Sequence, residues 1–167
     1  MGARLLPRTL PELFSYSLAI EREAAKRYAE LERFMREMGV EDVADELERI
    51  GREEQEQYEL IQLGTAGRAL PELAGWELSW HFPRVKGGKP APRSTREVLA
   101  SALAFERRTQ AFYVDVAENA RTASSRAFSA EMANDEQRHI ARLEVLLERE
   151  PDPATGIEAA DVQFRSI

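Results

Sequence analysis

The sequence predicts an all-α protein that folds as a four-helix bundle, and three observations support this prediction. Helix-forming residues dominate the chain, no segment shows the sustained alternation of β-branched residues typical of strands, and four long segments carry apolar residues at spacings of three and four. A chain of 167 residues can build one domain with a sizeable core but falls short of two comfortable ones. We therefore expect the bundle to occupy residues 1–150 and a C-terminal tail to occupy 151–167.

The first two predicted helices form a hairpin. Thr9 and Glu12 have the spacing of a capping box and predict a helix over residues 10–38, which Gly39 ends. The next apolar stripe predicts a second helix over residues 41–63. Because only two or three residues join the helices, they must run antiparallel.

The third and fourth predicted helices repeat this arrangement. Ser94 and Glu97 again have capping-box spacing and predict a helix that runs to about residue 121. A fourth helix is expected over residues 125–150, where Pro151 ends it. The short connection between them predicts a second antiparallel hairpin.

A long connection, rich in Gly, Pro and aromatic residues, joins the two hairpins over about residues 64–94. A helix of 25 residues is about 37 Å long, and 30 extended residues at about 3.3 Å each can span that length. The connection can therefore run the length of the bundle, so that the third helix starts parallel to the second.

Composition excludes several classes of function. The chain has no cysteine, which excludes disulfides, thiolate catalysis, iron–sulfur clusters and cysteine-based zinc sites. A formal net charge of -7 argues against nucleic acid or an anionic membrane surface as the main partner. No apolar stretch has the length of a transmembrane helix or of a secretion signal, and we therefore expect a cytoplasmic protein.

Polar residues interrupt each of the four apolar stripes near its middle, where a core residue is expected. Four carboxylates, one amide and one imidazole should therefore point inward. These residues are Glu21, Glu54, Gln57, Glu106, Glu136 and His139. Counted from the turn of each hairpin, they lie within about 6 Å of one level.

The two hairpins also repeat each other. Glu21 is followed seven residues later by Tyr28, and Glu106 is followed seven residues later by Tyr113. Each second helix then carries Glu-x-x-Gln or Glu-x-x-His, whose members share one helix face. This pattern indicates an internal duplication.

Burying four carboxylates together costs several kcal/mol per ion unless something neutralises them. Two divalent cations would neutralise them. The di-iron pattern of helical bundles consists of a Glu from each of two helices and Glu-x-x-His from each of the other two. A single inward Glu could instead reach solvent at the edge of a stripe, but four at matched depth favour a metal site.

At this point the sequence resembles the ferritin-like di-iron carboxylate superfamily, and within it the rubrerythrin-like branch. The resemblance covers about residues 10–150 and rests on four stretches in order: 19–28, 50–57, 104–113 and 133–139. It implies a ferritin-like bundle with two iron ions, manganese and zinc being the alternatives.

The resemblance also implies roles for particular residues. Metal-ligand positions of the family fall on Glu21, Glu54, Glu106, Glu136 and His139. Tyr28 and Tyr113 match tyrosines that hold the bridging carboxylates, and the other interpretation of both is that they are ordinary core aromatics.

The chain departs from the family in several places. Gln57 stands where the family has histidine, so it is either a weaker ligand or a bystander. Thr109 replaces an additional glutamate that rubrerythrins carry, and Gln55 stands in the place of the methionine that ligates haem in bacterioferritins, which argues against haem. Without cysteine there is no rubredoxin domain, so electrons would come from a separate donor. His81 could supply the missing ligand or simply pack in the connection.

Three functions follow as hypotheses. The favoured one is a di-metal protein with oxidase, peroxidase or ferroxidase chemistry toward dioxygen, hydrogen peroxide or ferrous iron. The second is a metal-binding or structural protein whose site Gln57 has made incompetent for turnover, and the third is a protein–protein module without metal. A homodimer is expected because the apolar residues outside the inward stripes need cover. These residues are Trp76, Trp80, Phe82 and Phe164.

Overall fold

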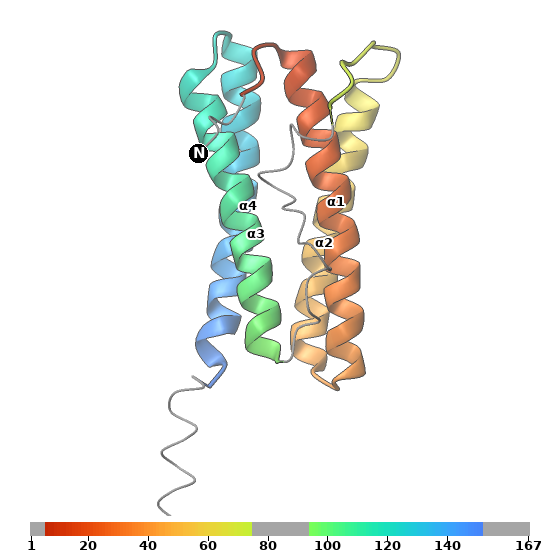
Figure 1. Cartoon of the computed structure of the whole chain (residues 1–167), viewed down its shortest axis with the longest axis vertical. Helices are drawn as coiled ribbons and strands as arrows, with labels where there is room; N and C mark the ends of the chain where they lie inside the picture. Colours follow the sequence, from red (N-terminus) through yellow and green to blue (C-terminus); the bar gives the residue numbers. More distant parts are fainter. Residues whose placement is uncertain (1–5, 75–93, 152–167) are drawn as a thin grey trace, which may run out of the picture.

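Four helices lie side by side in the computed structural model, which describes residues 6–74 and 94–151 (Figure 1). They are α1 (Leu10–Glu37), α2 (Glu41–Gly64), α3 (Thr95–Asn119) and α4 (Ala123–Arg149). No strand occurs in these two ranges. The predicted all-α bundle of four helices is therefore confirmed, and none of the described helices has the length and apolar character needed to span a membrane.

The helix ends follow from local hydrogen bonds. The Thr9 hydroxyl accepts a hydrogen bond from the Glu12 N–H, and the Glu12 carboxylate accepts one from the Thr9 N–H, which completes the predicted capping box. Gly39 follows α1 with φ of +74°, a conformation that glycine adopts without strain. The fourth helix begins two residues earlier than predicted, because the Thr122 hydroxyl caps the Ser125 N–H at 3.1 Å.

The bundle consists of two antiparallel hairpins, α1–α2 (the first hairpin) and α3–α4 (the second hairpin). Helix α3 runs in the same direction as α2 and opposite to α1, as the colours in Figure 1 show. The predicted direction of α3 is thus correct. The residues behind the predictions about His81 and the homodimer lie outside the described residues: Trp76, Trp80, His81, Phe82 and Phe164.

The core divides into two apolar clusters. One contains Tyr28, Met35, Leu47, Leu99 and Leu143, together with neighbouring buried side chains. The other contains Leu13, Ile20, Phe112, Tyr113 and Val116, again with their buried neighbours. Along every helix the inward acids lie between members of the two clusters, so apolar side chains separate these acids from both ends of the bundle.

Helices α1 and α2 pack closely where Gly51 faces Tyr28. A Cβ atom built on Gly51 would lie 2.8 Å from the Cβ of Tyr28, closer than two such atoms can approach. Glycine at this position therefore permits the contact that places the Tyr28 ring in the core.

Candidate metal centre

Four buried side chains from three helices meet in the middle of the bundle. Glu54 of α2, Glu106 of α3, and Glu136 and His139 of α4 each offer an atom such that all four atoms lie within 4.8 Å of one another. None of the four residues is more than 4% exposed. Ligand atoms that each lie about 2.0–2.2 Å from a central ion are separated by at most twice that distance. This is close to the 4.8 Å found here, so the group can hold a metal ion.

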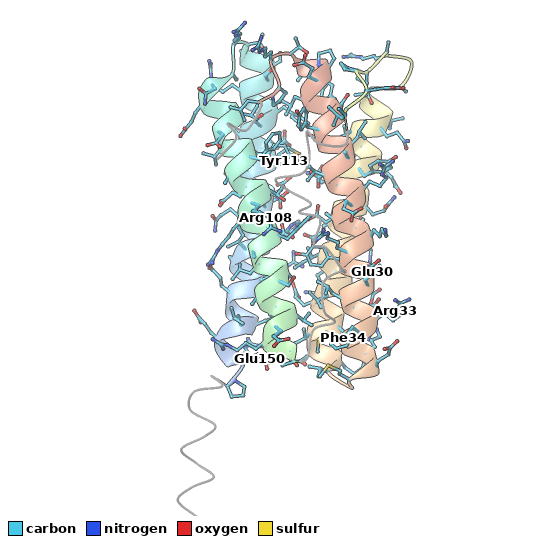
Figure 2. The ribbon with its side chains drawn as sticks, viewed as in Figure 1. Glu30, Arg33, Phe34, Arg108, Tyr113 and Glu150 are labelled. Carbon is cyan, nitrogen blue, oxygen red and sulfur yellow. The ribbon has the colours of Figure 1, made fainter. Side chains whose placement is uncertain are left out.

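The fourth inward acid, Glu21, interacts with this group through Glu54. Glu21 is fully buried, and it accepts a hydrogen bond from the Tyr113 hydroxyl at 2.7 Å. Figure 2 shows Tyr113 reaching from α3 into the space between α3 and α1. We call Glu21, Glu54, Glu106, Glu136 and His139 the acidic cluster.

The second tyrosine mirrors the first. Tyr28 of α1 donates a hydrogen bond to Glu106 of α3, whereas Tyr113 of α3 donates to Glu21 of α1. Because α1 and α3 are antiparallel, the seven-residue spacing from Glu to Tyr places each hydroxyl level with the acid of the opposite helix. Both rings are also core residues, so each tyrosine packs in the core and also holds a buried carboxylate by a hydrogen bond.

Burial and mutual repulsion dominate the electrostatics of the cluster. Burial, followed by the negative charge of Glu54, raises the pKa of Glu21 well above its ordinary value. The pKa of Glu136 is raised for the same two reasons, with Glu106 adding to the effect. Without a cation, the site therefore disfavours the charged forms of these two carboxyl groups.

Two further members, His139 and Glu106, lie within ion-pair distance of each other. Burial opposes the charge of His139, but its contacts with Glu106, Glu136 and Glu54 raise its pKa above the ordinary value. Burial likewise opposes the charge of Glu106, yet Glu136 and His139 lower its pKa. His139 Nδ1 lies 2.8 Å from Glu54 Oε1 and 3.7 Å from Glu106 Oε2.

The cluster also leaves several polar atoms without a hydrogen bond of regular geometry. Each of its five members has one such buried atom: Glu21 Oε2, Glu54 Oε1, Glu106 Oε2, Glu136 Oε2 and His139 Nδ1. Unsatisfied buried polar atoms are rare and call for an explanation. Five of them, all of types that coordinate metals and all in one place, fit a bound cation.

A second layer of polar residues surrounds His139. Its Nε2 atom lies 3.0 Å from Glu53 Oε2. The Arg142 guanidinium donates to both oxygens of Glu53, at 2.9 and 2.7 Å, and also donates to Glu46. An outer carboxylate on the second nitrogen fixes the orientation of a histidine, as is usual in metal sites.

Gln57, the last of the predicted site residues, contacts Asp135. The side-chain amide nitrogen of Gln57 donates a hydrogen bond to Asp135, and both residues are half-buried. The structure thus brings five of the six predicted residues together and places the sixth on an outer carboxylate.

Neither outer carboxylate follows from the apolar stripes of the sequence. Glu53 belongs to the acid run before Gln57, which has the composition of a solvated helix face, and Asp135 lies outside the apolar stripe of its helix. A signal does exist in the duplication, because each Glu-x-x-Gln or Glu-x-x-His is preceded by an acid. Residues 53–57 read Glu-Glu-Gln-Glu-Gln, and residues 135–139 read Asp-Glu-Gln-Arg-His.

Comparisons with known proteins agree with this geometry at the level of the fold. The sequence matches no family model and no curated protein. The structure is similar to the crystal structure of an uncharacterized conserved protein from Magnetospirillum magnetotacticum MS-1, with a TM-score of 0.78 and 27% sequence identity. The match covers 87% of this chain and 97% of that one.

Proposed function

We propose that this protein is a rubrerythrin-like di-metal carboxylate protein that performs redox chemistry with dioxygen or hydrogen peroxide, or that oxidises ferrous iron. The observation that supports the proposal best is the set of five buried ligand atoms in the acidic cluster that have no hydrogen bond of regular geometry. Bound iron ions would supply the redox electrons for this chemistry.

Four carboxylates and one imidazole provide the ligands in this proposal. Glu54 of α2, Glu106 of α3 and Glu136 of α4 each bring a carboxylate oxygen to the same small space, and His139 completes the group. Their combined negative charge, which is costly in a protein interior, matches two divalent ions. Glu21 contributes the fourth carboxylate from α1.

The tyrosines hold the carboxylates in place. Hydrogen bonds from Tyr28 and Tyr113 occupy one oxygen each of Glu106 and Glu21, and they leave the other oxygen for a cation. The two apolar clusters exclude water from above and below, which strengthens the electrostatic interactions inside.

Thr109 limits the chemistry that the resemblance implies. Its side chain is buried, and its hydroxyl donates to the Phe105 carbonyl oxygen at 3.2 Å within α3. It therefore adds no carboxylate where rubrerythrins have one. Together with the absence of cysteine, this favours oxidase or ferroxidase chemistry, with a separate protein as electron donor.

The contact between Gln57 and Asp135 favours a second candidate function, because no imidazole is available at that position. In this alternative the protein binds one ion, with zinc as the natural candidate, and acts in metal binding or as a scaffold without turnover.

Metal analysis separates the two functions. The protein is purified from iron-supplemented medium, its metal content is measured, and the consumption of oxygen and peroxide is followed after ferrous iron is added. Two irons per chain with turnover support the di-metal function, whereas one redox-inert ion supports the alternative. The His139→Ala variant should lose most of the metal, while Glu56→Gln, an exposed acid on α2, serves as the control. If purified and reconstituted protein bind no ion, both functions are wrong.

A further inference from the structure

The two outer carboxylates occupy equivalent positions in the duplicated hairpins. Glu53 directly precedes Glu54 on α2, and Asp135 directly precedes Glu136 on α4. Each contacts the opposite hairpin at the residue three positions after the inward Glu. Glu53 meets His139 Nε2 at 3.0 Å, and Asp135 accepts from the amide nitrogen of Gln57. The contact between Gln57 and Asp135 is therefore the counterpart of the contact between His139 and Glu53.

Arginines hold both outer carboxylates. Arg142 donates to Glu53 at 2.9 and 2.7 Å, and Arg138 donates to the Asp135 oxygen that Gln57 does not use. Each carboxylate therefore has an arginine partner of its own, and it can impose an orientation on the residue that it contacts across the interface between the hairpins.

This orientation decides which atom of Gln57 remains for a cation. A carboxylate only accepts hydrogen bonds, so the atom of the Gln57 side chain that faces it must be the nitrogen. The carbonyl oxygen, which is the only atom of the amide that can ligate a cation, is then not used by Asp135. Glu53 acts in the same way on His139, because it engages Nε2 and leaves Nδ1 beside the acidic cluster.

We infer that Asp135 is a positioning residue that orients Gln57 so that the Gln57 carbonyl oxygen serves as a ligand for a second ion. Glu53 orients His139 for the first ion in the same way. This inference rests on the proposed metal-binding function. We call the ligands around each of the two ions a half-site. The half-site of Gln57 and the half-site of His139 then have the same arrangement and differ in one donor atom, an amide oxygen in place of an imidazole nitrogen. Because the amide oxygen is the weaker ligand for transition metals, the half-site of His139 fills first and that of Gln57 second.

Stepwise titration of the metal-free protein with Co²⁺ tests this inference, because cobalt reports its ligands in the visible spectrum, and Zn²⁺ titration by equilibrium dialysis supplies the affinities. The wild type should bind two ions in two steps. The Asn side chain of Asp135→Asn offers Gln57 a hydrogen-bond donor as well as an acceptor, so the Gln57 amide can turn over and exchange the places of its nitrogen and oxygen. It should weaken only the second step, by about tenfold to a hundredfold. Glu53→Gln should weaken the first step by a similar factor.

Further variants test whether Asp135 acts through Gln57. Gln57→Ala should remove the second step, and in that background Asp135→Asn should have no further effect on either step. Asp135→Glu should restore part of the affinity of the second step. The exposed acids Glu56 and Glu131, on the same two helices, provide the matched controls as Glu56→Gln and Glu131→Gln, which should bind as the wild type does.

The outcomes separate this inference from the proposed function. If the wild type binds neither Co²⁺ nor Zn²⁺, the proposed function fails. If it binds two ions and Asp135→Asn leaves both steps and the cobalt spectrum unchanged, the inference is wrong and the proposed function stands. The inference is also wrong if the wild type binds a single ion that Gln57→Ala does not affect, or if Asp135→Asn lowers only the melting temperature of the metal-free protein.

Discussion

The hydroxyl of Tyr28 on α1 donates a hydrogen bond to the carboxylate of Glu106 on α3, so the first hairpin holds an acid of the second. Removing this hydroxyl by Tyr28→Phe keeps the ring in its apolar cluster but deprives a buried carboxylate of a donor. We expect the metal-free protein to lose about 1–3 kcal/mol of unfolding free energy. Chemical denaturation measures the loss, and Tyr58→Phe, away from the acidic cluster, should change stability much less.

Neutralising one acid of the cluster should have opposite effects on stability and on binding. In Glu136→Gln the side chain keeps its size but loses a charge that burial and Glu54 disfavour. The metal-free variant should be more stable than the wild type, by on the order of 1 kcal/mol, and should lose most of its affinity for metal. Melting temperatures with and without Zn²⁺ test both effects. A variant that keeps the wild-type metal-dependent shift would contradict the assignment of Glu136 as a ligand.

The stability of the metal-free protein should fall as the pH rises. Glu21, Glu136 and His139 all have raised pKa values in the folded state, the acids above 4.5 and the histidine above 6.5. Between the unfolded-state and the folded-state pKa of each group, the folded protein holds more protons than the unfolded chain. The stabilisation from these protons is complete below the unfolded-state pKa and is lost as the pH rises through the folded-state pKa. The lowered pKa of Glu106 acts in the opposite direction only below about 4.5.

Urea denaturation of the metal-free protein between about pH 5 and about pH 8 tests this expectation. Bound metal should reverse the trend, because a cation favours the charged forms of Glu21 and Glu136, which burial disfavours. Calorimetric titration in buffers of different ionisation enthalpy should then register proton release. A metal-free protein that becomes more stable toward pH 8 would show that these acids are ionised without a cation.

Gly51 should tolerate no larger residue. A methyl group at this position would collide with Tyr28, so Gly51→Ala must push α2 away from α1 or displace the tyrosine from Glu106. We expect a loss of about 1–3 kcal/mol in stability and weaker metal binding. Gly64→Ala is the matched control, because a Cβ there meets no other atom within 4 Å. Equal effects of the two substitutions would mean that the close approach at Gly51 is unimportant.

The predicted homodimer can be tested by light scattering. Within the described residues, Leu60 and Leu63 near the end of α2 are 64% and 75% exposed, which adds to the apolar surface expected from the sequence. The expected mass is twice that of the 18.9 kDa chain at micromolar concentration. An 18.9 kDa species alone would contradict the prediction.

The sequence predicts contacts within a helix or a hairpin better than contacts between hairpins. The capping box of Thr9 and the inward direction of Glu21 follow from local spacing, because three- and four-residue periods fix which face a residue occupies. The depth of the acids follows from counting residues away from a tight turn. These local rules were sufficient to predict the fold and the convergence of the acidic cluster.

Contacts across the interface between the hairpins depend on rotations and distances that no local period specifies. Glu53 and Asp135 lie beside inward residues, yet their partners belong to the opposite hairpin. Periodicity assigns such flanking positions to the surface, and only the three-dimensional arrangement shows that they reach His139 and Gln57. The closeness of Gly51 to Tyr28, which lies within the first hairpin, also escaped prediction, because local periods do not give the distance between two packed helices.

The exchange of hydrogen bonds between Tyr28 and Glu106 and between Tyr113 and Glu21 has a consequence for assembly. Neither hairpin contains a complete half-site, since each supplies the tyrosine that the other hairpin's acid requires. If the acidic cluster binds a cation as proposed, docking of the hairpins and capture of the cation are parts of a single equilibrium, in which each makes the other more favourable. If the duplication began as a single hairpin, that ancestor could have completed both tyrosine–glutamate pairs only by pairing with a second copy of itself.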